Sequence, residues 1–356
     1  MHTVVPMSAH RIANRLAEKL IPWYREVRRP LPWRENRDPY RIWVSEVMLQ
    51  QTTVTAVIPF YEKFMQRFPT LEKLALAKEE SVLEYWAGLG YYSRARSLYK
   101  SAKALHELGR FPKTCIELIE LPGFGPYTSR AVSSLAFGEP VGVVDGNVIR
   151  VLSRVFDLDL EWWKTKDRDF IQIEADRLAN ASVEMLKVDP SDLNQALMEL
   201  GATICTPQSP TCMMCPWSRE CLARKNDTIA LRPRPKPRRE SEIWLWTPEL
   251  IRRRDLSLLL VKNDYAPFLK GHMIWPGQAV RLKKKPKSFH YKGGVTHHEI
   301  YVNVAASKKT ASTKELRRWA DVEKDWVSPN EIKTKVPSSL IRRALTVLDL
   351  DDTSKD

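Results

Sequence analysis

LPGFGPYTSRAV occupies residues 121–132 and lies between two segments whose apolar residues have helical spacing. Gly123 and Gly125 allow the backbone to turn sharply and to approach a ligand closely. The helix expected to begin near Pro126 would present free N–H groups and the positive end of its dipole to an anion. An ordinary corner between two helices has the same pattern, so this predicted hairpin, residues 115–137, has to be interpreted with the rest of the chain.

The surrounding region has helical spacing throughout. Apolar residues three and four positions apart predict a first helix that runs up to Val27, in which Pro22 should cause a kink or a restart. Further helices are predicted at residues 40–51, 54–67, 71–76, 80–87, 93–108, 115–120, 126–137, 147–156, 168–187 and 191–204. Strand-like alternation is nearly absent, so residues 1–228 are expected to form an all-α domain.

The composition changes after this region. Residues 229–241 are predicted to be a basic, proline-rich linker, whose charges could lie along a phosphate backbone. Beyond it, strands are predicted at 242–247, 256–261 and 299–305, and helices at 313–319 and 337–348. Residues 242–350 therefore suggest a smaller α+β domain. The basic run RLKKKPK at 281–287 is either a second binding patch or a solvated loop.

Charge and hydropathy limit the classes of partner. The chain has 356 residues and a formal net charge of +14, which favours polyanionic partners, first nucleic acid and then anionic membrane. No apolar run approaches the roughly 18 residues that a membrane span needs. The first ten residues lack the apolar core of a secretory signal, so we expect no membrane partner.

The cysteine pattern indicates a bound metal or cluster. There are five cysteines, and four of them follow the pattern C-x6-C-x2-C-x5-C between residues 205 and 221. Zinc sites usually have two C-x2-C pairs, whereas here only one pair is closely spaced. The spacing therefore favours an iron–sulfur cluster, with zinc or unligated thiols as the alternatives. Cys115 lies in an apolar helical segment and is expected to be a core residue.

Two carboxylates are candidates for acid–base chemistry. Glu46 would share a helix face with large apolar residues, which should raise its pKa towards the range that a general acid needs. An exposed glutamate on an amphipathic helix is the alternative. Asp145 is well placed to cap the helix that begins near Asn147. It could also be a second carboxylate, held ionised by helix N–H groups and facing Glu46 across a pocket.

These residues together resemble a MutY-type adenine DNA glycosylase of the helix-hairpin-helix superfamily. The resemblance covers nearly the whole helical domain, in order. It rests on LPWR (31–34), SEVMLQQT (45–52), GLGYYSRAR (88–96), LPGFGPYTSRAV (121–132), VVDGNVIRVLSR (143–154), NQALMELGATIC (194–205) and the cysteine loop. It implies a mainly α, two-lobed helical domain with an iron–sulfur loop and a smaller Nudix-like α+β domain.

The resemblance implies removal of adenine mispaired with 8-oxoguanine or guanine, after the nucleotide is flipped out of the duplex. Glu46 would protonate adenine N7, and Asp145 would stabilise the oxocarbenium-like sugar. Asn147 would help to order the site, and Tyr127 matches the site tyrosine of many members. The reaction would be a monofunctional hydrolysis, without a Schiff-base adduct between the enzyme and the DNA.

Further positions match residues that contact the DNA. Arg34 and Gln195 match positions that line the adenine pocket, and Gln50 and Tyr91 match residues that wedge into the duplex. The backbone of the hairpin glycines, Gly123 and Gly125, would hold phosphate.

The resemblance also implies a 4Fe–4S cluster that fastens the last helix and shapes a DNA-facing loop. Its ligands would be Cys205, Cys212, Cys215 and Cys221. The loop 206–211 reads TPQSPT and lacks the basic residues of many relatives. The nearby Arg219, Arg224 and Lys225 could replace them.

The second domain resembles the family's Nudix-like domain only weakly, through Leu269–Gly271 and Ile274–Gly277. No complete Nudix hydrolase motif is present, so we expect no pyrophosphatase activity. Where relatives often carry Phe-Ser-His, this chain has Val295-Thr296-His297. Thr296 and His297 are thus candidates for reading 8-oxoguanine, although His297 could simply be a hydrogen-bonded strand residue.

Two other functions compete with this interpretation. An endonuclease III-type glycosylase and lyase would need a lysine amine after the hairpin, where this chain has Tyr127. A non-catalytic iron–sulfur protein that binds DNA is the second alternative. In each case the expected partner is double-stranded DNA, here with an A:8-oxoguanine or A:G mispair, and a monomer suffices. The expected compartment is reducing and contains DNA, as bacterial cytoplasm does.

Overall fold

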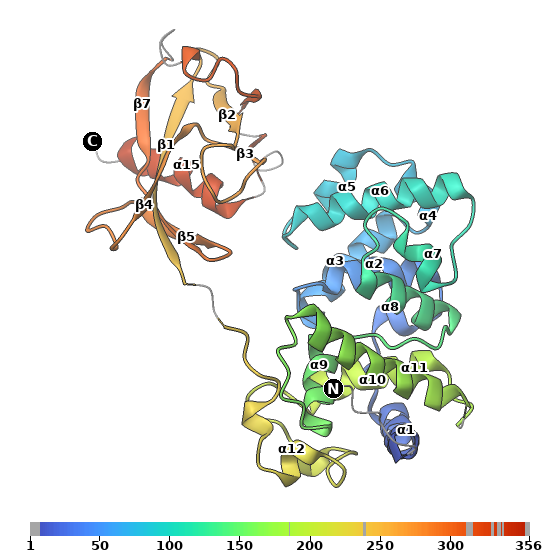
Figure 1. The fold of residues 1–356 in the computed structure, drawn as a ribbon. Helices are drawn as coiled ribbons and strands as arrows, with labels where there is room; N and C mark the ends of the chain where they lie inside the picture. The colour runs from blue at the N-terminus through green and yellow to red at the C-terminus, as the bar shows by residue number, and fades with distance from the viewer. Residues whose placement is uncertain are drawn as a thin grey trace. The chain divides into compact units, whose positions relative to one another are not determined.

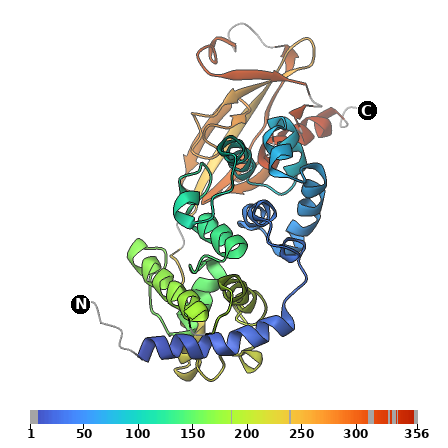
Figure 2. The ribbon, with the colours of Figure 1, turned by 90° about the vertical axis from the view of Figure 1, so that its right-hand side faces the viewer.

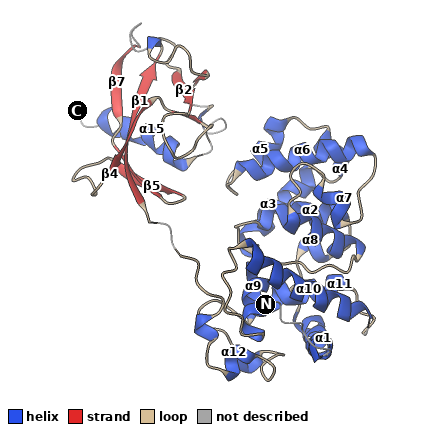
Figure 3. Cartoon of the chain, in the orientation of Figure 1, coloured by secondary structure: helices blue, strands red, loops and turns tan. Residues whose placement is uncertain are grey.

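The computed structural model divides into two compact units, Met1–Lys236 and Pro237–Asp356 (Figure 1). It describes residues 8–184, 186–237, 240–310, 316–328, 331–332, 336 and 338–352. The first unit is built of helices and the second contains the strands (Figure 3). No helix within the described ranges combines the length and the apolar character that crossing a membrane requires.

The helices of the first unit follow the predicted positions closely. They are α1 (Ser8–Val27), η1 (Pro32–Arg34), α2 (Pro39–Leu49), α3 (Val54–Arg67), α4 (Leu71–Ala75), α5 (Glu79–Trp86), α6 (Tyr92–Leu108), α7 (Cys115–Ile119), α8 (Pro126–Phe137), α9 (Gly146–Val155), α10 (Thr165–Glu184), α11 (Pro190–Thr203), η2 (Cys212–Met214), α12 (Leu222–Lys225) and η3 (Ile229–Leu231). Pro22 lies inside α1, which continues through it as one helix, so the predicted restart does not occur.

Side-chain caps explain why several helices begin where they do. Asp38 accepts a hydrogen bond from the backbone N–H of Tyr40, and Asp189 accepts one from Ser191. In both cases a proline occupies the first turn, where its missing N–H costs nothing. Thr114 caps α7 in the same way. These local signals place α2, α7 and α11, which carry or support the candidate site.

The helical unit has two hydrophobic cores. One includes Trp43, Phe64 and Trp86 and is formed mainly by α2 to α8. The other is formed by α1, α9, α10 and α11, with Trp217 from the cysteine loop packed into it. Figure 2 shows α1, in blue, lying across this second lobe, where it packs against α10 and α11. The predicted two-lobed helical fold is confirmed.

The second unit is an α+β domain built around a long first strand. Its elements are β1 (Glu242–Arg252), β2 (Leu258–Lys262), β3 (Met273–Ile274), β4 (Gly277–Leu282), β5 (Tyr291–Val295), β6 (His298–Val302), β7 (Ala305–Thr310), β8 (Lys324–Val327) and α15 (Ser339–Asp352). Strand β1 pairs antiparallel with β4 and parallel with β6, and its later residues pair with β2 and β7. The helix α15 covers the core, where Trp275 donates a hydrogen bond to the carbonyl of Ile341 at 2.7 Å.

Three expectations for this region need correction. The predicted strand 299–305 is two strands, β6 and β7, because the chain leaves the ladder at Asn303 and Val304. Strands β3, β4, β5 and β8 were not predicted. Of the predicted helix 313–319, residues 313–315 lie outside the described part of the chain, and 316–317 are helical.

The linker is partly fastened to the helical unit. Arg232 pairs with Asp157 at 2.9 Å, and Arg234 pairs with Asp159 at 2.9 Å. Arg232 and Arg234 are thus paired with carboxylates of the helical unit, and the expectation that linker charges could lie along phosphate stays a prediction. Residues 238–239 lie outside the described part of the chain.

Candidate functional site

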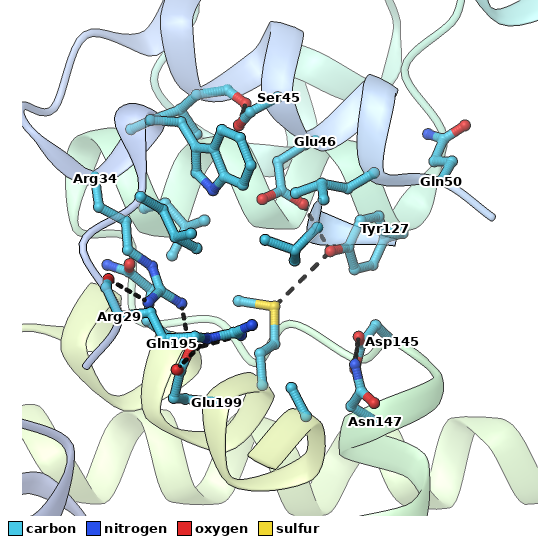
Figure 4. Close-up of a pocket in the computed structure, with 18 of the residues that line it drawn as sticks. Arg29, Arg34, Ser45, Glu46, Gln50, Tyr127, Asp145, Asn147, Gln195 and Glu199 are labelled. Carbon is cyan, nitrogen blue, oxygen red and sulfur yellow. Dashed lines mark hydrogen bonds and ion pairs between the residues drawn. The ribbon is translucent and has the colours of Figure 1, made fainter. Parts of the chain in front are cut away.

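A cavity of about 1100 Å³ lies in the helical unit, lined by residues of both lobes. Its walls come from η1, α2, α8, α9 and α11 (Figure 4). Seven of the predicted site residues line it: Arg34, Glu46, Gln50, Tyr127, Asp145, Asn147 and Gln195. Tyr91, Gly123 and Gly125 are not among its lining residues. The fold therefore brings the proposed acid–base residues Glu46 and Asp145 together, although they are 99 positions apart in the sequence.

Glu46 is buried at the centre of the cavity wall, with only 5% of its surface exposed. The Tyr127 hydroxyl donates a hydrogen bond to its Oε2 at 2.7 Å. Burial raises the pKa of Glu46 to about 7, and the charge of Asp145 adds to the rise, while the Tyr127 hydrogen bond and Arg34 oppose it. The predicted rise is confirmed, and at neutral pH this carboxyl group can hold a proton.

Asp145 caps α9 as predicted. Its carboxylate accepts hydrogen bonds from the backbone N–H of Val148 at 2.7 Å and from the side-chain amide of Asn147 at 2.8 Å. Burial nevertheless raises the pKa of Asp145, against these lowering hydrogen bonds. Burial is thus the larger effect on the pKa of Asp145, while the helix N–H groups favour the ionised carboxylate as expected.

Tyr127 stands beside both acidic groups. Its hydroxyl lies between Glu46 and the sulfur of Met198, which is 3.9 Å away (Figure 4). Burial and the neighbouring charge of Glu46 raise the pKa of Tyr127 well above its usual value, so it stays protonated as a donor. No amine occupies this position of α8.

The opposite wall contains an acidic residue that the sequence analysis missed. Glu199 is buried on α11 and binds Arg29 at 2.5 Å and Arg34 at 2.9 Å. Burial acts to raise its pKa, but the hydrogen bonds and charges of the two arginines hold the pKa of Glu199 below its usual value. Arg34 thus lines the cavity with its charge already paired. The sequence did contain a signal for Glu199, because it is an acidic residue on the apolar face of the predicted helix 191–204.

Arg94 is a second residue that the sequence analysis missed, and it contacts both predicted wedge residues, Gln50 and Tyr91. The buried guanidinium of Arg94 donates to the backbone carbonyls of Val47 and Met48, each at 3.0 Å, and to the carbonyl of Gln50. Its charge also lies over the ring of Tyr91, 5.1 Å from the centroid. Arg94 therefore closes the C-terminal end of α2 and holds the segment that presents both wedges.

The wedge residues themselves differ in exposure. Tyr91 is 56% exposed and has a positive φ of 49°. Gln50 is half-buried and donates a hydrogen bond to Thr128 at 3.3 Å. Left-handed backbone at a non-glycine residue is strained, and such strain concentrates at functional sites.

The hairpin turn requires glycine at one position. Gly123 has a φ of +83°, and a Cβ there would approach the Ser101 hydroxyl oxygen to 2.7 Å. At Gly125, which precedes α8 with a φ of −90°, a Cβ would meet nothing within 4 Å. The predicted hairpin, α7 to α8, is therefore held against α6 at Gly123.

The four half-buried cysteines of one loop offer a thiolate set of the kind that an iron–sulfur cluster or a zinc ion takes. Arg154 donates to the Cys205 sulfur at 3.4 Å, which suits an anionic thiolate set. Arg150 joins the site to this loop by donating to Asn147 at 2.8 Å and to the Cys205 carbonyl at 2.7 Å.

The two remaining candidates lie in the second unit. Thr296 and His297 form the turn between β5 and β6, where Thr296 is exposed with a φ of +56°. The Thr296 hydroxyl donates to the carbonyl of Val295 at 2.7 Å. Both side chains are accessible at the end of this hairpin.

Comparison with known proteins supports the same family. The family described as "HhH-GPD superfamily base excision DNA repair protein" matches residues 44–170. An adenine DNA glycosylase of Homo sapiens is 47% identical over 217 residues, which are 58% of this chain and 39% of that protein. One from Buchnera aphidicola (subsp. Schizaphis graminum) is 29% identical over 332 residues, covering 86% of this chain and 93% of that protein.

A solved structure described as a thermostable thymine-DNA glycosylase is also similar. It is 28% identical, with a TM-score of 0.54, and the match covers 61% of this chain and 98% of that one. The chain spans less than half the length of the mammalian relatives it matches.

Proposed function

Because the chain belongs to the HhH-GPD superfamily of base excision DNA repair proteins, with MutY-type relatives, we propose that it is an adenine DNA glycosylase. It hydrolyses the N-glycosidic bond of adenine paired with 8-oxoguanine or guanine in duplex DNA. The observation that carries this proposal is the buried Glu46 carboxyl. It accepts a hydrogen bond from the Tyr127 hydroxyl, in a cavity that Asp145 also lines. The glycosidic bond is inaccessible in the base stack, so the nucleotide has to flip into that cavity.

The two carboxyl groups divide the chemistry. The protonated Glu46 donates its proton to adenine N7, so that the C1′–N9 bond breaks with its electron pair leaving on a neutral base. The sugar becomes oxocarbenium-like, and the Asp145 carboxylate stabilises that cation. Water then adds to C1′ and loses its proton to a carboxylate. Asn147 orients Asp145 through the hydrogen bond at 2.8 Å.

The cysteine loop supports a structural 4Fe–4S cluster. Cys205, Cys212, Cys215 and Cys221 would hold it, and the bound cluster would supply rigidity and charge rather than hydrolysis. Arg154 would balance the charge of the thiolates, since it already contacts the Cys205 sulfur. Arg219, Arg224 and Lys225 are exposed around this loop and are the groups available to meet phosphate.

The proposed enzyme is monofunctional. A lyase step needs an amine that forms a Schiff base with the sugar, whereas the residue beside Glu46 is the protonated Tyr127. In the second unit, the Thr296 hydroxyl and the His297 ring are the proposed contacts to 8-oxoguanine. The full-length protein is proposed to act as a monomer.

Single-turnover assays on four duplexes test the function: A:8-oxoguanine, A:G, A:T and thymine glycol:A. We expect alkali-dependent strand cleavage at adenine in the first two, and no adduct trapped by borohydride. Trapping, or cleavage at thymine glycol, would support the endonuclease III-type alternative. Tight binding of A:8-oxoguanine without adenine release would support the non-catalytic alternative.

A further inference from the structure

A cluster of potential metal ligands lies at the start of the second unit, apart from the cysteine loop. Glu242, His297 and His298 each offer one ligand atom, and these atoms all lie within 4.8 Å of one another. The fold brings them together because β1 and β6 are paired in parallel, with Glu242 opposite His298. The Glu242 Oε2 and His298 Nε2 atoms are 3.6 Å apart. The rings of His297 and His298 lie side by side, with centroids 4.0 Å apart.

The hydrogen bonds around the histidines leave nitrogen lone pairs available. The Thr296 hydroxyl donates its proton to the Val295 carbonyl, so its oxygen can only accept from the histidines. The Thr296 hydroxyl oxygen lies 3.4 Å from the Nδ1 atoms of both His297 and His298. An Nδ1–H tautomer, assigned from this contact, leaves each Nε2 free to act as a ligand.

Glu242 is oriented by groups outside the cluster. Its Oε2 accepts a hydrogen bond from the Trp244 indole at 3.0 Å, and its Oε1 pairs with the exposed Arg281 at 3.2 Å. His298 is buried, with the rings of Trp244 and Phe268 at edge-on distances of 6.3 and 6.2 Å. Such outer contacts fix the direction of metal ligands and are typical of real sites.

We propose that Glu242, His297 and His298 bind a divalent transition-metal ion of the zinc class. Two imidazoles and one carboxylate suit such an ion and leave a coordination position for water or another ligand. The bound ion would tie the β5–β6 turn to the first residue of β1, which directly follows the linker.

Metal binding to the full-length protein can be measured by equilibrium dialysis against zinc chloride, followed by elemental analysis of zinc and iron. We expect one zinc in addition to the iron of the cysteine loop. Glu242→Gln, His297→Asn and His298→Asn should each weaken zinc binding by at least about tenfold. His272→Asn, at an exposed histidine outside the cluster, should leave zinc binding unchanged.

A thermal shift separates lost binding from lost folding. Zinc should raise the melting temperature of the wild type but not of His297→Asn, whose melting temperature without zinc should match the wild type because the ring is half-exposed at a turn. Zinc binding that is unchanged in all three cluster variants, or reduced equally in His272→Asn, would overturn the proposal.

A functional consequence follows, and it rests on the proposed function. A metal-bound His297 cannot offer the same hydrogen bond to 8-oxoguanine, so zinc should reduce the preference for A:8-oxoguanine over A:G in the wild type and not in Glu242→Gln. Zinc binding with an unchanged preference would support the metal site and overturn the role of His297 in lesion reading. Zinc binding by a protein without adenine excision would overturn only the proposed function.

Discussion

At the scale of single residues, the site depends on an acid kept out of water. Glu46 belongs to a helix whose residues 42–48 are all buried, and within the described part of the chain only Tyr127 gives its carboxyl a hydrogen bond. The ionised form is therefore costly in the folded protein, whereas in the unfolded chain it is solvated. The same burial that suits proton donation near neutral pH thus reduces stability, as is common at catalytic sites.

This cost predicts a pH-dependent gain on substitution. The pKa of Glu46 rises from 4.5 to about 7 on folding, so the native state binds more protons between these values. The stability contribution of Glu46 is present below about pH 4.5 and declines as the pH rises through about 7. Glu46→Gln should therefore be more stable than the wild type at pH 8, by up to about 3 kcal/mol, and should gain little at pH 4.5. Urea unfolding at the two pH values checks this, and an equal difference at both would contradict it.

Arg94 leads to a second prediction at this scale. Lysine keeps the charge of Arg94 but cannot reach several carbonyls and cover the Tyr91 ring at once. Arg94→Lys should slow adenine release on the order of 100-fold, because the wedge segment moves. The control is Arg96→Lys, at an exposed arginine of the same helix α6, which pairs with Glu79 of α5. Equal rates for the two variants in single-turnover assays would contradict this role.

At the scale of elements, the hairpin offers a matched pair of glycines. Gly123→Ala should destabilise the protein by about 1–3 kcal/mol and weaken DNA binding, because its φ is positive and Ser101 blocks a Cβ. Gly125→Ala should change stability by less than about 1 kcal/mol, since its space is open and its φ is ordinary. Thermal unfolding and DNA titration of both variants test this. A larger loss of stability in Gly125→Ala would show that the turn is held differently.

The helices could be predicted from sequence because their signals are local. Asp38-Pro39 and Asp189-Pro190 mark the starts of α2 and α11, and the apolar spacing defines which face is buried. The strands β4 and β5 were missed because Gly277, Gly293 and Gly294 interrupt any alternation. Gly277 is required by the fold, since a Cβ there would come within 2.3 Å of the Thr247 carbonyl oxygen. No feature of the neighbouring sequence indicates such a close approach between distant parts of the chain.

The candidate site was predictable only in part. Glu46 and Asp145 could be proposed from their own surroundings, because a helix face and a cap are local features. The ion pairs of Glu199 with Arg29 and Arg34 join α11 to residues about 170 positions earlier. The contact of Arg94 with α2 likewise depends on how the helices pack. Tertiary partners of this kind do not follow from spacing along the chain.

At the scale of the whole molecule, the net charge of +14 predicts salt-sensitive DNA binding. The logarithm of the binding constant should fall linearly with the logarithm of salt concentration, by ~0.9 for each phosphate contact. Arg219→Ala should reduce that slope by about one contact, because Arg219 is exposed on the cysteine loop. Arg234→Ala should leave it unchanged, since Asp159 already neutralises that charge. Fluorescence titrations at several salt concentrations measure the slope for each variant. Equal slopes for Arg219→Ala and Arg234→Ala would contradict this assignment.

The most direct test of the account is the rate of adenine release by the wild type and by Glu46→Gln, measured from pH 5 to 9 in single turnovers. We expect the wild-type rate to fall as the pH rises through about 7, where Glu46 loses its proton. Glu46→Gln should bind the A:8-oxoguanine duplex normally and release adenine at least ~100-fold more slowly. A Glu46→Gln rate close to that of the wild type, or a wild-type rate that rises through pH 7, would contradict the account.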